Sequence, residues 1–150
     1  MGDQMFRRKL FTFAASLAIL ACAEPAAAAT LMVSKIDSCT CCEGWAEQMK
    51  KAGFMVQMHS VQDVAPLEKR LGVPDRLRSC HVAQLGNYVI VGHVPAADVK
   101  RLLAMKPRAT GLAVPGMVIG SPGMDTGGRP EHYKVMLFDK SGKTSVFASY

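Results

Sequence analysis

The sequence predicts one domain of mixed α and β structure, of the α/β or α+β class. An apolar run at residues 31–36 precedes a segment with helical spacing, and an alternating segment follows at residues 54–61, which together indicate a strand–helix–strand unit. Two later pairs of alternating segments, each joined by a glycine-containing turn, indicate hairpins. Once residues 1–29 are set aside as a leader, the 121 that remain of 150 suffice for one hydrophobic core but not for two.

The leader has the three parts of an export signal. A basic segment at residues 7–9 precedes an apolar stretch at residues 10–21, and small residues suit cleavage after Ala29. The apolar stretch is shorter than the roughly 20 residues that a membrane-spanning helix needs. We therefore expect a periplasmic protein without stable membrane insertion. The letters ILAC, which end at Cys22, form an imperfect lipoprotein box and leave lipid anchoring as an alternative.

The charge pattern argues against nucleic-acid binding. The net charge is +6, but the 18 basic residues are scattered along the chain instead of forming a stripe. Aromatic residues make up only 7% of the sequence, so few side chains are available to stack on bases. We expect no nucleic-acid partner.

The first helix is expected to begin near Cys41, directly after the strand at residues 31–36. Trp45 and Met49 recur at helical spacing and predict its buried face, and Gly53 is placed to end it. The cysteines of the segment SCTCCEGW therefore lie at the first strand-to-helix junction.

The remaining elements follow from their caps and turns. We expect a helix at residues 63–71 capped by Asp63, a hairpin at residues 80–94, a helix that begins at Pro95 and stops at Pro107, and a C-terminal hairpin at residues 133–150. Between the last helix and that hairpin lie two similar turns, VPGM at residues 114–117 and SPGM at residues 121–124. Each presents a methionine on a backbone that proline and glycine restrict.

Cys39 and Cys42 have C-x-x-C spacing at the N-terminus of the predicted helix. The free N–H groups and positive dipole end of a helix lower the pKa of a nearby thiol. Thiolates are good nucleophiles and good ligands for soft metals, so this placement suits both disulfide exchange and metal binding. The presence of Cys41 favours metal binding over disulfide exchange, because a third adjacent thiol would misdirect the exchange between Cys39 and Cys42.

Cuprous ion is the metal that this donor set predicts. Three thiolates in one turn can surround one Cu(I) or bridge several, and Cys80, Met117 and Met124 would add soft donors from elsewhere in the chain. His81 follows Cys80 directly and is a candidate ligand, as is His93 in GHVP, although a histidine in a loop is more often bonded to the backbone.

Three alternatives stay open. The chain could be a thiol–disulfide oxidoreductase that uses Cys39 as nucleophile and Cys42 as resolving thiol. The cysteines could form structural disulfides, although a Cys41–Cys42 bond would be strained. A zinc-bound interaction module could use a Cys₃His set, with Cys39, Cys42, Cys80 and His81 as ligands.

Four blocks together carry a resemblance to a known family: CTCCEGW, GVPDRLRSCHVA, VGHVPAADVKRLL and GLAVPGMVIGSPGM, in this order. They resemble the family called domain of unknown function 411, which includes periplasmic copper-resistance proteins of the CopG type. The resemblance spans residues 31–150. It implies a thioredoxin-like fold with an inserted hairpin, in which the redox pair has become a C-x-C-C copper site.

The resemblance also assigns the site residues. It maps the copper ligands onto Cys39, Cys41 and Cys42, the SCH block onto Cys80 and His81, the GHVP block onto His93, and the two methionine turns onto Met117 and Met124. It places the cis-proline of thioredoxin-like folds at Val114-Pro115. Val91 departs from the family, in which an acidic residue is common at that position.

The sequence therefore predicts a periplasmic protein of copper resistance and homeostasis. We expect it to bind Cu(I) through a thiolate cluster, with metal-linked redox activity as a further expectation and no firmly assigned catalytic residue. The expected partners are copper ions and other periplasmic copper-handling proteins.

Overall fold

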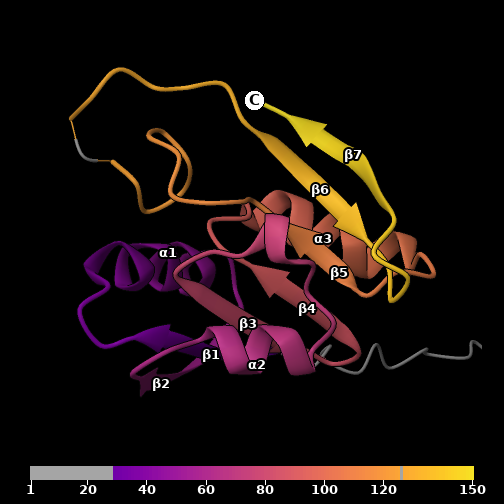
Figure 1. Cartoon of the computed structure of the whole chain (residues 1–150). Helices are drawn as coiled ribbons and strands as arrows, with labels where there is room; N and C mark the ends of the chain where they lie inside the picture. The colour runs from indigo at the N-terminus through magenta and orange to yellow at the C-terminus, as the bar shows by residue number, and fades with distance from the viewer. Residues whose placement is uncertain (1–28, 126) are drawn as a thin grey trace, which may run out of the picture.

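The computed structural model describes residues 29–125 and 127–150 as one seven-stranded mixed sheet with helices on both faces (Figure 1). Residues 1–28 of the predicted signal sequence, which include Cys22, lie outside the described residues. The elements are β1 (Thr30–Ile36), α1 (Thr40–Lys51), β2 (Met55–Val61), α2 (Ala65–Arg70), the 3₁₀ turn η1 (Asp75–Leu77), β3 (His81–Leu85), β4 (Tyr88–Val91), α3 (Ala96–Met105), β5 (Gly111–Ala113), β6 (Lys134–Phe138) and β7 (Thr144–Ser149). The prediction of a mixed α and β domain is confirmed.

The order of strands in the sheet is β2-β1-β3-β4-β5-β6-β7. β1 is parallel to β2 and antiparallel to β3, so the strand–helix–strand unit predicted from the sequence occupies one edge. The C-terminal hairpin of β6 and β7 forms the other edge. The carboxyl end of β1, where α1 starts, is thereby placed beside the start of β3.

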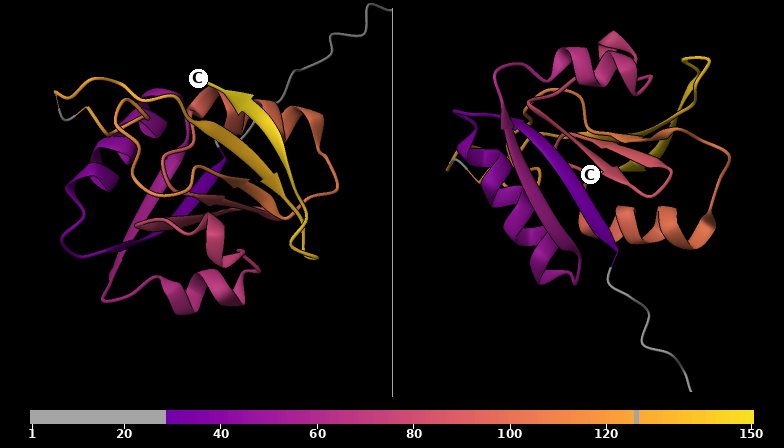
Figure 2. Two further views of the ribbon diagram at one scale, coloured as in Figure 1. Left: turned by 45° about the horizontal axis from the view of Figure 1, so that its top comes forward. Right: turned by 90° about the horizontal axis from the view of Figure 1, so that it is seen from below.

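Two hydrophobic clusters cover the two faces of the sheet. α1 and α3 pack on one face, where Trp45 and Met49 meet Val33, Leu102 and their neighbours. α2 and η1 pack on the opposite face, with Leu77 in contact with the second cluster. Figure 2 shows this separation of the helices in its right-hand view. Among the described residues, none of the helices has the length and apolar character that crossing a membrane requires.

The structure corrects several expectations. The hairpin of β3 and β4 is not an insertion but the centre of the sheet, because β3 pairs directly with β1. The short strand β5 was not predicted, since three residues carry no measurable periodicity. No cis peptide bond occurs in the described ranges, so the bond before Pro115 is trans.

Two helices, α2 and α3, begin at a different residue from the one predicted. Val64 is the N-cap of α2, although the Asp63 carboxylate still accepts a hydrogen bond from the amide of Ala65 at 2.8 Å. Pro95 is the N-cap of α3 and not its first residue. α1 ends as expected, because Gly53 follows it with a φ of 94°.

Candidate metal centre

The turn between β1 and α1 presents three cysteines. Cys39 is the N-cap of α1, and its Sγ accepts a hydrogen bond from the amide of Cys42 at 3.3 Å. The amide of Cys39 donates to the carbonyl of Ile36 at 3.0 Å, which closes the turn tightly after the strand. A cysteine here replaces the serine or aspartate that usually caps a helix, so its sulfur lies at the positive end of the helix dipole.

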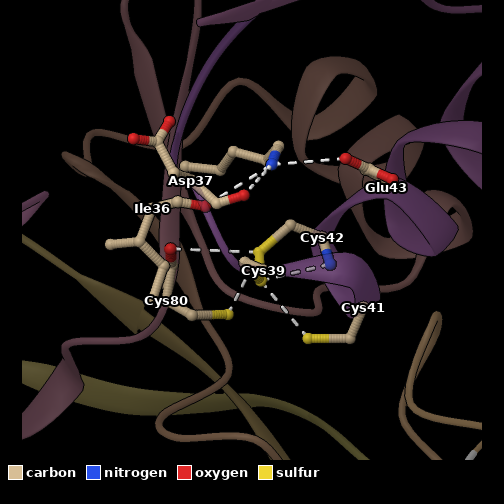
Figure 3. Close-up of polar contacts among 8 residues, drawn as sticks. Ile36, Asp37, Cys39, Cys41, Cys42, Glu43 and Cys80 are labelled. Atoms are coloured by element: carbon tan, nitrogen blue, oxygen red, sulfur yellow. Dashed lines mark hydrogen bonds and ion pairs between the residues drawn. A yellow bond between two sulfur atoms is a disulfide. The ribbon is translucent and has the colours of Figure 1, made fainter. Parts of the chain in front are cut away.

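Cys39 and Cys42 are joined by a disulfide, whereas Cys41 and Cys80 are free thiols among the described cysteines (Figure 3). Each free thiol contacts one half of the disulfide. The Sγ atoms of Cys41 and Cys39 are 3.3 Å apart, and those of Cys80 and Cys42 are also 3.3 Å apart. The four Sγ atoms all lie within 4.8 Å of one another. Reduction of the disulfide would give four thiols at one point.

Cys80 reaches this point because β3 pairs with β1. The amide of Ile36 donates to the carbonyl of Cys80 at 3.4 Å, directly before the β3 register begins. Ser79, which precedes Cys80, is also fixed by two hydrogen bonds. Its amide donates to the carboxylate of Glu68 at 3.2 Å, and its hydroxyl donates to the carbonyl of Gly116 at 2.7 Å. The position of Cys80 is therefore set by both the sheet and a side-chain anchor.

Two buried histidines lie behind Cys80 and form a second possible ligand group with it. His81 is fully buried, with its ring 4.5 Å from that of Trp45 and 4.9 Å from that of His93 between centroids. Its Nδ1 is 3.6 Å from the Sγ of Cys80, and its Nε2 has no hydrogen-bond partner among the described residues. Burial, reinforced by His93, lowers the pKa of His81 to about 3, so its ring is neutral at ordinary pH.

His93 is held in one tautomer by a backbone carbonyl. Its Nδ1 lies 2.8 Å from the oxygen of Pro122, which can only accept, so Nδ1 carries the proton. Its Nε2 then has a free lone pair and faces the Sγ of Cys80 at 3.5 Å. Burial lowers the pKa of His93, and the bond to Pro122 partly opposes that shift. A neutral imidazole with a free Nε2 is suited to binding a metal ion.

The electrostatics at Cys80 favour the protonated thiol. Burial, followed by the charge of Cys41, raises the pKa of Cys80 to about 11. The thiol of Cys80 can therefore donate a hydrogen bond to the Nε2 of His93. A bound cation would reverse this balance, because a coordinated thiol loses its proton.

Comparisons with known proteins place this site in a family. A family model described as "Protein of unknown function, DUF411" matches residues 77–124. A solved structure named "Copper resistance protein copG- Form 2" is 38% identical, with a TM-score of 0.77, over 82% of this chain and 98% of that chain. A second, "Copper resistance protein copG- Form 1", is 39% identical, with a TM-score of 0.76, over 81% and 96%. The chain belongs to the DUF411 family. A search of curated proteins found no match.

The DUF411 model covers Cys80, His81 and His93 but not the C-x-C-C segment, which lies within the longer likeness to the solved structures. Val91, which precedes the GHVP block, is apolar, and the carbonyl of Pro122 orients His93. This contact joins residues 29 positions apart, so sequence inspection could not reveal it.

The methionine turns border the site from two sides. Gly123, with a φ of 84°, leaves no room for a side chain, because a Cβ there would meet backbone atoms of Cys41 and Trp45. This contact fixes the SPGM turn on the first turn of α1, and Met124 next to it is buried. The VPGM turn is bound through Gly116 to the residues before Cys80, and Met117 is 58% exposed.

Lys35 was not among the predicted site residues, but it is buried beside the cysteine turn. Its ammonium group donates to the carbonyl of Asp37 at 3.0 Å and forms an ion pair with Glu43 at 3.3 Å. Because Lys35 shares a strand face with Leu31 and Val33, the alternation of β1 was a signal that its side chain points inward. Lys35 ties the end of β1 to the start of α1.

Proposed function

We propose that this member of the DUF411 family is a periplasmic copper-binding protein that holds Cu(I) for copper resistance and homeostasis. The observation that carries the proposal is the approach of four cysteine sulfurs to within 4.8 Å of one another. The names of the two similar solved structures support the choice of copper. So does the chemistry of the donors, because thiolates prefer cuprous ion to harder metals.

Cys39, Cys41, Cys42 and Cys80 are the proposed thiolate ligands. The contact between Cys80 and both histidines supports His81 and His93 as nitrogen donors on the inner side. Since Cys80 belongs to both groups of candidate ligands, its sulfur is placed to bridge two metal ions, which supports a small multinuclear cluster. Met117 and Met124 are further candidates because their turns border the site. Zinc fits less well than copper, since this donor set is dominated by sulfur.

The proposal requires that the Cys39–Cys42 disulfide be reduced before all four sulfurs can bind metal. The test is an anaerobic titration of reduced residues 30–150 with Cu(I) against a chromogenic chelator. We expect the Cys39/Cys41/Cys42→Ser variant to bind Cu(I) more than about 100-fold more weakly. The exposed His59→Gln variant serves as the control and should bind like the parent chain. Equal affinity in the triple variant and the parent would refute the proposal.

A second candidate function is thiol–disulfide exchange, favoured by the Cys39–Cys42 disulfide at the N-terminus of α1. The order β2-β1-β3-β4, with β1 and β2 parallel and joined by α1, supports a thioredoxin-like core for such an activity. This function predicts turnover of a disulfide substrate by metal-free protein. Absence of turnover in the presence of a chelator would exclude it.

Export is the remaining part of the proposal. We propose that residues 1–29 direct the chain to the periplasm and are then removed. Cell fractionation and N-terminal sequencing of the recovered protein test this, with Thr30 as the expected first residue. A mature chain that begins at a lipidated Cys22 would show anchoring instead.

A further inference from the structure

The Cys39–Cys42 disulfide is shielded from solvent more completely than the two free thiols, Cys41 and Cys80. Cys39 is 6% exposed and Cys42 is 0% exposed, so an outside thiol has little access to either sulfur. Cys41 and Cys80 are half-buried, and each touches one sulfur of the disulfide. Direct attack by a partner is therefore hindered, whereas a route through a free thiol of this chain is open.

Cys80 lies beside the half of the disulfide that it would attack. The pairing of β3 with β1 and the hydrogen bond from the amide of Ser79 to Glu68 hold it there. The Sγ of Cys42, which Cys80 would attack, is 3.3 Å away.

The leaving group also favours Cys80 over Cys41. Attack by Cys80 on Cys42 releases Cys39, whose sulfur accepts the amide of Cys42 at the N-terminus of α1, where a thiolate is stabilised. Attack by Cys41 on Cys39 would instead close a disulfide between the N-cap of α1 and the residue only two positions after it.

We propose that Cys80 relays reduction to the buried disulfide, with a dithiol reductant as the partner. Cys80 loses its proton to solvent, its sulfur bonds to that of Cys42, and the Cys39–Cys42 bond breaks with its electron pair on Cys39, which takes up a proton. Cys80 is half-buried and not fully buried, so a thiolate of the partner then attacks its sulfur in the new disulfide and releases Cys42, which takes up a proton. The second thiol of the partner attacks this mixed disulfide, so the partner leaves oxidised and the chain holds four free cysteines.

The relay depends on the proposed function at one point only: the four free cysteines that it produces are the state proposed to bind copper. Its own chemistry involves no metal, so it can be tested in the presence of a chelator. Failure of copper binding would leave the relay intact, and failure of the relay would leave copper binding by chemically reduced protein intact.

The first experiment traps the intermediate pairing. In a Cys39→Ser variant oxidised under mild conditions without metal, mass spectrometry of proteolytic peptides should find Cys42 linked to Cys80. A free Cys80 in that oxidised variant would overturn the relay, because it would show that the two sulfurs cannot bond.

The second experiment measures the rate at which dithiothreitol reduces the oxidised mature chain in the presence of a chelator. We expect Cys80→Ser to be reduced at least about tenfold more slowly than the parent, since the buried bond then has no relay. The exposed His59→Gln control should keep the parental rate. A parental rate in Cys80→Ser, or a loss of rate confined to Cys41→Ser, would overturn the proposal.

Discussion

A buried carboxylate fixes the loop that carries Cys80. The Glu68 side chain is 1% exposed, and it accepts the amide of Ser79 while the nearest nitrogen of Arg78 is 3.9 Å away. Burial is the largest influence on this group and raises its pKa above the ordinary value of 4.5, although Ser79 and Arg78 act in the opposite direction. The ionised form of Glu68 is therefore tolerated in the fold at a cost in stability.

We predict that Glu68→Gln stabilises the protein at pH 7 and not at pH 4. A carboxyl whose pKa is raised on folding contributes stability that is fully present below pH 4.5 and is lost as the pH rises through the folded pKa. Each unit of upward shift corresponds to about 1.4 kcal/mol. Glutamine keeps an oxygen that can accept the Ser79 amide but carries no charge.

Urea unfolding of the oxidised, metal-free chain at the two pH values measures this difference. The exposed Glu131→Gln variant is the control for loss of a surface carboxylate. A variant that is as stable as the parent at pH 4 but less stable at pH 7 would contradict the prediction, because the charge would then stabilise the fold.

The two methionine turns offer a matched comparison at the scale of an element. Gly116 and Gly123 each stand between a proline and a methionine, and their φ angles are 73° and 84°. A Cβ on Gly116 would meet nothing within 4 Å, whereas one on Gly123 would come within 2.6 Å of backbone atoms of α1. The glycines therefore share a conformational requirement and differ only in packing.

We predict that Gly116→Ala costs about 1 kcal/mol of the free energy of unfolding, from the positive φ alone. Gly123→Ala should cost about 2–4 kcal/mol, because the SPGM turn must also move away from α1. The same movement would withdraw the carbonyl of Pro122 from His93. Chemical denaturation of both variants checks the difference, and equal losses would show that the turn is not packed as described.

Local patterns in the sequence predicted the elements that are long enough to show them. β1, α1, β2 and both hairpins follow from apolar periodicity and turn residues within each segment. The position of the β3–β4 hairpin could not be predicted in this way, because pairing with β1 depends on contacts between distant segments. The three residues of β5 are buried but carry no alternation.

The candidate site was predictable in composition and not in arrangement. The cysteines, histidines and methionines were identifiable by their types and spacing. The disulfide between Cys39 and Cys42, the contact of Cys80 with His93 and the buried charge of Lys35 depend on how β1, β3 and α1 meet. Such contacts are set by tertiary packing, which single-sequence patterns do not describe.

At the scale of the whole molecule, the site joins segments that are far apart in the chain. The C-x-C-C turn, the start of β3, the loop after β4 and the SPGM turn all contribute contacts around Cys80. A metal ion bound among these four segments would link them to one another. Since such a site forms only in the folded chain, binding should stabilise the whole domain.

We predict that Cu(I) raises the midpoint of thermal unfolding of the reduced mature chain. Metal at about 100 times its dissociation constant stabilises a folded protein by about 2.7 kcal/mol, which is roughly 10 °C for a domain of this size. Calorimetry of anaerobic samples measures the shift, and an excess of Cu(I) chelator should reverse it. The Cys39/Cys41/Cys42→Ser variant lacks three of the four sulfurs and should show little change. An equal shift in the variant would mean that the metal stabilises the protein from another site, because the C-x-C-C thiols are the only ligands that the substitution removes.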